Sequence, residues 1–313
     1  MTASMAPLFD SHPLMRDSAP RPATRDALTI VHGLVLQIEA RKAGKAAIHI
    51  ETVNSKPQPS IADISRQLPL FIECERYLPN EFLRSALFNA RNHKHSRRQM
   101  KRTEIAILGG GSITYTGEEL RQYDESVFLH LIRLAKEHPV NAQYLEFKPY
   151  SFCKAVGLPI NGDGYQRLRD SIERMQATSL SVYSKRLGEG ISLSMIPYFR
   201  WQNKETGKAM VRYQVSIPYQ LVRLFEGDHY TKMEWAQRQR LPVGLATWLY
   251  GYYGSHAVPY HHIISTLLLG AGIETAEVFK ARQLMKAAHD ALVKVGFLAS
   301  YEIVGDLIKV KRR

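Results

Sequence analysis

One order of elements, two helices followed by two short strands, occurs twice in this chain. Near the C-terminus, apolar spacing predicts helices over Tyr260–Leu269 and Thr275–Val295, and strands over Phe297–Val304 and Leu307–Val310. A helix pair followed by a hairpin is typical of a winged helix-turn-helix, which places its second helix in the major groove of duplex DNA. The C-terminal hairpin therefore indicates a DNA-docking unit.

The earlier copy lies in the middle of the chain. Pro149–Val156 and Tyr165–Thr178 have helical spacing, and Leu180–Arg186 and Ile191–Phe199 alternate as strands around a glycine turn. The sequence therefore predicts an α+β fold of tandem winged-helix domains (helix-turn-helix plus β-hairpin) with a flexible N-terminal tail.

Three regions follow from the composition along the chain. We expect residues 1–76 to be a flexible N-terminal region, since the first 59 residues are rich in proline, with a short helix over Arg25–Lys42. Residues 77–215 form the first predicted winged-helix domain and residues 216–313 the second. Two strands, Glu104–Leu108 and Ser112–Thr116, and a helix over Gly117–Glu137 are expected to precede the first helix pair.

The apolar faces of two helices in the second domain are expected to lie in its core. The helix over Pro242–Tyr253 is rich in aromatic residues, which we assign to packing rather than to base stacking. The buried face of the helix over Thr275–Val295 is predicted to consist of Val278, Ala281, Leu284, Met285, Ala288, Leu292 and Val295.

The charge balance favours an anionic partner. The chain of 313 residues has a formal net charge of +13, and nucleic acid is the commonest partner of such basic chains. No apolar run is long enough to span a bilayer and no signal peptide is visible, so a cytoplasmic protein is expected. The two cysteines, Cys74 and Cys153, fit a reducing compartment and make no disulfide framework.

A dense basic run precedes the first predicted strand. It is interleaved with His93 and His95, and no acidic residue falls between Asn92 and Thr103. Such a run either contacts DNA phosphates or is simply solvated, and we favour phosphate contact. Its cationic members are Arg91, Lys94, Arg97, Arg98, Lys101 and Arg102.

The second helix of each pair carries the candidates for reading bases. Arginine can bind guanine, and glutamine can bind adenine, through two hydrogen bonds each. The candidates in the first helix are Gln166, Arg167, Arg169 and Arg174. The candidates in the second helix and at the end of the hairpin are Lys280, Arg282, Gln283, Lys286, Lys311, Arg312 and Arg313. The alternative for each is a phosphate contact or a solvated side chain.

A short apolar peptide, Gln67-Leu68-Pro69-Leu70-Phe71, lies just before the first domain. It resembles the Gln-Leu-x-Leu-Phe peptide by which bacterial proteins dock on the polymerase sliding clamp. An extended segment would insert Leu70 and Phe71 into an apolar pocket, while Gln67 supplies hydrogen bonds at a second subsite. Leu68 completes the candidate clamp-binding set. The alternative is an apolar run that packs on the first domain.

Several blocks resemble the TrfA family of plasmid replication initiators, in the same order and over roughly Gln67 to the C-terminus. The blocks are Leu78–Glu81, Arg84–Phe88, Ala90–Asn92, Ile113–Leu120, Arg174–Thr178 and Phe225–Lys232. This resemblance implies an initiator that binds repeated origin sites (iterons), opens an adjacent AT-rich region and helps to load the host initiator and replicative helicase. It also implies that the protein binds iterons as a monomer and is held inactive as a homodimer.

Catalysis and cofactors are not expected. His93-Lys94-His95 superficially resembles the metal-binding pair of rolling-circle nickases, but the middle residue is a lysine in a basic run rather than an apolar strand residue. His261 and His262 are adjacent, so no helix or strand aims both at one metal ion. Two alternatives to an initiator stay open: a winged-helix transcriptional repressor, and an origin-nicking endonuclease.

Overall fold

The computed structural model describes residue 68 and residues 73–137, 144–184, 188–258, 261–275 and 277–313. Contacts divide the chain into two units, Met1–Gln58 and Pro59–Arg313, and every described residue lies in the second unit. The helix expected over Arg25–Lys42 lies outside the described residues. Within the described part of the chain, no helix is long and apolar enough to cross a membrane.

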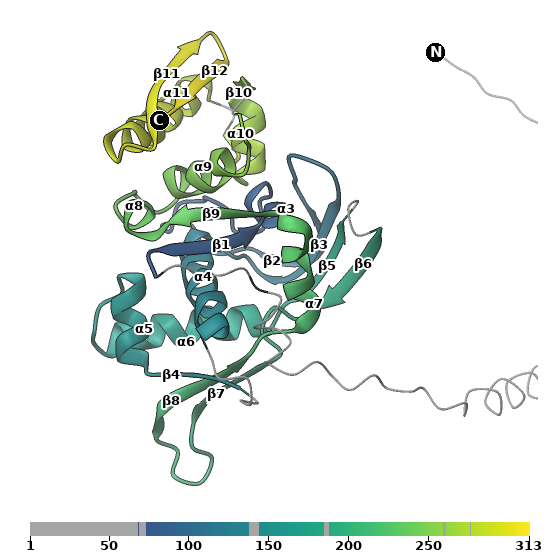
Figure 1. The fold of residues 1–313 in the computed structure, drawn as a ribbon, viewed down its shortest axis with the longest axis vertical. Helices are drawn as coiled ribbons and strands as arrows, with labels where there is room; N and C mark the ends of the chain where they lie inside the picture. Colours follow the sequence, from purple (N-terminus) through teal and green to yellow (C-terminus); the bar gives the residue numbers. More distant parts are fainter. Residues whose placement is uncertain (1–67, 69–72, 138–143, 185–187, 259–260, 276) are drawn as a thin grey trace, which may run out of the picture. The chain divides into compact units, whose positions relative to one another are not determined.

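The elements follow one another as Figure 1 labels them. The first half contains β1 (Glu75–Pro79), α3 (Asn80–Leu83), β2 (Gln99–Ile105), β3 (Ser112–Glu118), α4 (Gln122–Glu137), β4 (Leu145–Phe147), α5 (Pro149–Val156), α6 (Gly162–Gln176), β5 (Ser179–Ser184), β6 (Glu189–Leu193), β7 (Tyr198–Gln202) and β8 (Ala209–Ser216). The second half contains α7 (Tyr219–Val222), η1 (Arg223–Asp228), β9 (Tyr230–Glu234), α8 (Trp235–Gln239), α9 (Leu245–Gly254), β10 (His262–Ile263), α10 (Ile264–Gly270), α11 (Val278–Lys294), β11 (Leu298–Val304) and β12 (Leu307–Arg312).

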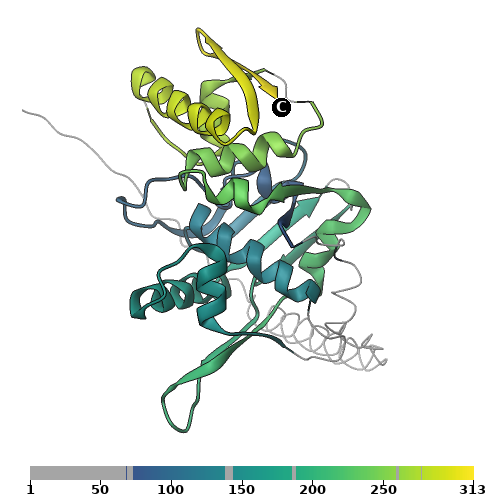
Figure 2. The ribbon, with the colours of Figure 1, turned by 60° about the vertical axis from the view of Figure 1, so that its left-hand side comes forward.

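The described strands form small antiparallel sheets. The first half holds a four-stranded sheet in the order β2-β3-β5-β6 and a three-stranded sheet in the order β4-β8-β7. The hairpin of β7 and β8 projects away from the helices in both views (Figures 1 and 2). The second half holds a sheet in the order β10-β12-β11.

The elements α5, α6, β5 and β6 follow one another in the predicted order in the first half, but β5 and β6 belong to the sheet with β2 and β3. The hairpin that contacts α6 is instead the later one, β7 and β8. The strand expected over Ile191–Phe199 is wrong, because it is two strands in different sheets. Met195 and Ile196 between them are both fully buried, so the alternation of a single strand breaks there. The amide of Met195 donates a hydrogen bond of 3.2 Å to the hydroxyl of Thr178 and holds the segment that passes from one sheet to the other.

Helix α4 lies at the centre of the first half, in contact with β1, α5 and α6 (Figure 1). Its residues Val127, Phe128 and Leu131 are fully buried. The helix begins at Gln122 rather than at Gly117, because Gly117 and Glu118 still pair with β2. The carboxylate of Asp124 then accepts the amide of Arg121 at 2.8 Å and caps the first turn.

The second copy of the order is α10, α11, β11 and β12. The aromatic residues of α9 are buried as expected, and the ring of Trp248 stacks on that of Tyr252 with centroids 4.9 Å apart. On α11, Ala281, Met285, Ala288 and Leu292 are buried. Val278 and Leu284 were expected beside them, but their side chains are exposed.

The two halves are joined by backbone contacts. Strand β1 pairs with β9 over its whole length, from Glu75 opposite Glu234 to Pro79 opposite Tyr230. In the turn between α10 and α11, Gly272 has φ +68° and lies against Asn89, so that an added Cβ would stand 2.7 Å from the Cβ of Asn89. Only glycine fits this left-handed position at such a close approach.

Candidate nucleic-acid interface

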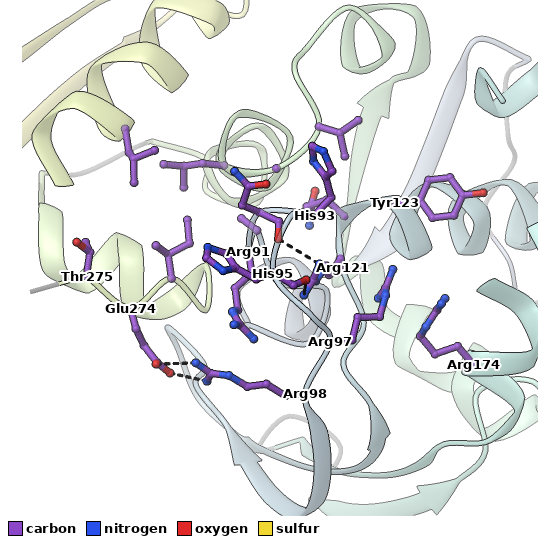
Figure 3. Close-up of a pocket in the computed structure, with 18 of the residues that line it drawn as sticks. Arg91, His93, His95, Arg97, Arg98, Arg121, Tyr123, Arg174, Glu274 and Thr275 are labelled. Carbon is purple, nitrogen blue, oxygen red and sulfur yellow. Dashed lines mark hydrogen bonds and ion pairs between the residues drawn. The ribbon is translucent and has the colours of Figure 1, made fainter. Parts of the chain in front are cut away.

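A cleft with a volume of about 1050 Å³ lies where the two halves meet. Figure 3 shows its walls. The loop of residues 90–98 forms one wall, and the turn between α10 and α11 forms another. Helix α6 contributes Arg167, Asp170 and Arg174, and α11 contributes Lys280 and Leu284. Both helices that the sequence marked as candidate readers of DNA therefore border one depression.

Arg121 holds the basic loop in place. Its guanidinium donates hydrogen bonds to the carbonyl oxygens of Asn92, His95 and Ser96, at 3.1, 3.0 and 3.0 Å. The same group bonds the carboxylate of Glu119 at 2.8 Å. Because three of these hydrogen bonds hold the backbone of the loop, the exposed side chains of His93, Lys94 and His95 are presented from a fixed base. No local sequence signal marks Arg121 for this role, because the three carbonyl groups that it binds in the loop lie more than twenty residues away.

Three arginines of the predicted interface form ion pairs with buried carboxylates. Arg97 and Arg174 both bond Asp124, whose side chain is fully buried, at 2.7 and 2.8 Å. Arg91 bonds Glu119, another fully buried side chain, at 2.8 Å. These pairs give the three arginines a structural role, because removing one partner would leave a buried carboxylate poorly compensated.

The charge state of Glu119 follows from this network. Burial alone would raise the pKa of its carboxyl group, but hydrogen bonds from Arg121, Arg91 and the amide of Arg98 more than offset burial, and the pKa is lowered overall. Glu119 is therefore ionised at neutral pH. Its side chain is fully buried, so this negative charge is not exposed in the cleft.

Arg98 links the first and second halves of the fold. Its guanidinium donates two hydrogen bonds of 2.7 Å to the carboxylate of Glu274, in the turn before α11. In Figure 3, two dashed lines between Arg98 and Glu274 mark this pair. Both side chains are largely exposed, so solvent screens the pair and its contribution to stability is small. The pair ties the end of the basic loop, just before β2, to the turn between α10 and α11.

Other predicted cations remain unpaired within the described part of the chain. Arg167 and Lys280 border the cleft with exposed side chains. Lys94 and Lys101 are exposed along the basic run. Arg102, also exposed, has φ +49° at a β-bulge in β2, an uncommon backbone conformation for a residue with a side chain. These side chains are free to contact an anion.

Side chains of β7, β8 and α6 itself orient the polar face of α6. The guanidinium of Arg169 lies over the ring of Trp201, 4.8 Å from its centroid, and donates to the hydroxyl of Tyr213 at 3.1 Å. The amide nitrogen of Gln166 bonds Asp170 one turn later. The strands β7 and β8 thus fix how this helix displays Gln166 and Arg169.

Helix α11 and its hairpin carry the second set of candidates. Arg282 pairs with Asp306 at the hairpin turn at 3.0 Å, and Lys286 pairs with Asp290 at 3.0 Å. All four side chains are exposed, so a phosphate can compete for either cation. Gln283, Lys311 and Arg313 are also exposed. Arg312 lies over the ring of Phe297, 5.4 Å from its centroid.

Most of the peptide Gln67–Phe71 lies outside the described residues. Leu68 is described, and its side chain is only 2% exposed within the core. Its carbonyl oxygen accepts a hydrogen bond of 2.8 Å from Lys136 at the end of α4. At this position the structure agrees with the alternative in which the run packs on the folded part.

The sequence of residues 36–312 matches the model of the TrfA protein family. Over 291 residues the chain is 32% identical to the plasmid replication initiator protein TrfA of Escherichia coli, covering 92% of this chain and 74% of that protein. The fold resembles a crystal structure of domains 2 and 3 of RctB, with a TM-score of 0.50, 12% identity, and 75% and 98% of the two chains covered. A crystal structure of the Pi initiator protein in complex with iteron DNA covers 78% of this chain and 100% of its own, with 10% identity and a TM-score of 0.48.

Proposed function

The chain belongs to the TrfA family, as a homologue of a plasmid replication initiator, and we propose that it initiates replication by binding directly repeated sites in origin DNA. The observation that carries this proposal is the cleft, to which α6 and α11 both present exposed cations, Arg167 and Lys280. The relative's printed name and the net charge of +13 support the same assignment.

The two repeated units act as winged helices in this proposal. Helices α6 and α11 are the recognition helices, and each enters a major groove of the duplex. The basic run supplies phosphate contacts through Lys94, Lys101 and Arg102, whose side chains are exposed. Phosphate contacts hold the register, and side chains on the two helices read the bases. Arg91, Arg97 and Arg174 support this surface from beneath through their buried carboxylates.

Later steps of initiation are part of the proposal. The bound protein promotes opening of the adjacent AT-rich DNA and recruits the host initiator and helicase. The monomer is the form that binds DNA, in equilibrium with a homodimer. The first unit's strands expected over Glu104–Leu108 and Ser112–Thr116 are candidates for a dimer contact. Among the described strands, β2 lies at an edge of the four-stranded sheet and pairs only with β3, whereas β3 lies between β2 and β5, so β2 is the strand that can offer an edge.

Docking on the host sliding clamp through Gln67–Phe71 stays a separate proposal. Replacing Leu70 and Phe71 with alanine should abolish clamp binding measured on an immobilised clamp, and should leave DNA affinity unchanged. If the double variant instead lost thermal stability and DNA binding together, these residues would belong to the core, as Leu68 does.

A binding measurement tests the proposed function. The probe is a duplex recovered by the wild-type protein from a randomised library, and the affinity is followed by fluorescence anisotropy at several salt concentrations. We expect tandem copies to be enriched, with affinity falling steeply as salt rises. Each phosphate contact removed, in Lys94→Ala or Lys280→Ala, should lower the slope of log K against log salt by about 0.9.

Lys232→Ala provides the matched control. Lys232 is exposed on β9, outside both helix pairs and their hairpins, where it pairs with Glu75. Its loss should leave both affinity and salt slope unchanged. A wild-type protein that enriches no sequence, or whose affinity ignores salt, would contradict the proposal. Covalent relaxation of supercoiled origin DNA in the presence of Mg²⁺ would instead reveal an endonuclease.

A further inference from the structure

A large aromatic side chain stands on the outer face of α11. Phe279 is 74% exposed, in the first turn of a helix whose inner face is fully packed. Val278 beside it is 60% exposed. A single exposed apolar residue is ordinary, but this pair lies at the end of a helix that is proposed to enter DNA.

The helical repeat places Phe279 on the same face as the polar candidates. With 3.6 residues per turn, residues 279, 283, 286 and 290 follow one stripe. The buried residues Ala281, Met285, Ala288 and Leu292 follow the same spacing two positions later, on the opposite side of the helix. Phe279 therefore projects in the same direction as Gln283 and Lys286, away from the core.

The surroundings of Phe279 indicate the chemistry of what covers it. Lys280, Arg282 and Lys286 are exposed around it. An apolar protein partner would leave these cations without anions, whereas a duplex supplies phosphates beside an apolar group. In the major groove that group is the C5-methyl of thymine, which phenylalanine and other apolar side chains contact. N-terminal residues of a recognition helix are the ones that approach base edges.

We propose that Phe279, with Val278 beside it, is a specificity-determining residue that contacts a thymine methyl group in each repeated site. The inference rests on the proposed function and adds a residue that carries no charge and no hydrogen-bonding group. Lys280 and Lys286 then contact DNA phosphates on either side of the thymine methyl group.

The test compares thymine with deoxyuridine, which lacks the methyl group. In the duplex selected by the wild-type protein, each thymine is replaced in turn by deoxyuridine, and dissociation constants are measured for wild type and Phe279→Ala. At one or two positions the wild type should bind deoxyuridine about fourfold more weakly, the effect of one buried methyl-sized group. Phe279→Ala should bind the thymine duplex at least as weakly, with no further loss on the deoxyuridine duplex.

Two variants accompany this test. Phe279→Leu keeps an apolar group and should retain part of the discrimination. Val211→Ala alters a side chain that is 80% exposed on β8 and should leave discrimination at the wild-type level. Because Phe279 is exposed, its variants should melt at the wild-type temperature, which separates a lost contact from a lost fold.

Three results would overturn the inference. If the Phe279→Ala variant discriminated thymine from deoxyuridine as well as the wild type does, another residue would contact the methyl group. Unchanged discrimination combined with loss of dimers in sedimentation would assign Phe279 to a contact between two copies of the chain. Failure of the wild type to enrich any sequence would remove the proposed function itself, a result distinct from the other two.

Discussion

Arg167 and Arg174 lie on the same helix, seven residues apart, in different environments. Arg174 is 12% exposed at its side chain and donates to Asp124 and Glu118, at 2.8 and 3.0 Å. Arg167 borders the same cleft without an ion pair among the described residues. The two arginines look alike in the sequence, because the carboxylates that distinguish them come from β3 and α4, roughly fifty residues earlier.

The first prediction separates these two roles. Arg174→Ala should lower the free energy of unfolding by about 2 kcal/mol, since it removes charge-assisted hydrogen bonds from a buried carboxylate. Arg167→Ala should change stability by less than about 0.5 kcal/mol but weaken binding to the selected duplex. Urea unfolding and anisotropy measure the two quantities. Equal losses of stability in both variants would show that Arg167 is also structural.

Buried histidines predict how stability depends on pH. Burial, together with the charges of His256 and His261, lowers the pKa of His262 from 6.5 to about 4. The unfolded chain therefore binds more protons than the folded chain between these values, and stability falls as pH drops from about 6.5 to about 4. The melting temperature should decrease between pH 7.5 and pH 5.

His262→Gln is the variant that checks this assignment. It should flatten the decrease in part, because His130 is also buried, with its pKa lowered by burial to about 3. Glutamine retains a group able to bond the hydroxyl of Tyr252, which lies 3.3 Å from Nε2 of His262. A variant with the wild-type pH dependence would place the titrating group elsewhere.

At the scale of elements, the helix pairs and hairpins were predictable because their signals are local. Helical spacing and glycine turns marked α5, α6, α11 and the C-terminal hairpin within a few residues. The second strand of the earlier hairpin was drawn too long, and α10 begins at Ile264 rather than at Tyr260, after the short strand β10. Strands β1 and β9 went unpredicted, because each is only five residues long and its partner lies about 150 residues away. The exposure of Val278 and Leu284 was also missed, since apolar periodicity cannot distinguish a core face from a face that contacts another molecule.

The sequence predicted which cations lie in the candidate interface, but not which of them form ion pairs with carboxylates elsewhere in the fold. The basic run contains no acidic residue, which favoured six free cations, yet Arg91, Arg97 and Arg98 have carboxylate partners from distant segments. Lys94, Lys101 and Arg102 are exposed, as a phosphate-binding run requires. Only the folded chain shows which cations are bound internally.

The start of α6 gives a prediction at this scale. The side-chain oxygen of Asn161 accepts the amide of Gly164 at 2.9 Å and caps the helix. Asn161→Ala should cost about 1 kcal/mol of stability, and Asn161→Asp, which retains an acceptor, should cost much less. Thermal unfolding of the two variants measures the difference. Equal losses would mean that the side chain matters for the loop before α6 rather than for the cap.

At the scale of the whole folded unit, the distance between helices α6 and α11 depends on how the first and second halves of the fold are joined. The pairing of β1 with β9 supplies a continuous backbone ladder between them. The amide of Ala90 adds a hydrogen bond of 2.8 Å to the carbonyl oxygen of Ala271, and Arg98 adds its bridge to Glu274. These contacts predict a fixed separation between α6 and α11 rather than two domains on a flexible tether.

Lengthening the DNA site tests this rigidity. Inserting about 5 base pairs, half a helical turn, between the two segments of the selected site should turn one segment away from its helix. Inserting about 10 base pairs, one helical turn, returns both segments to the same face of the duplex but leaves them farther apart. A rigid unit should therefore lose affinity in both cases, down to the level of a site with one segment scrambled. The same insertions outside the site should have no effect, and full affinity for either lengthened site would show that the halves move apart despite the β1–β9 pairing.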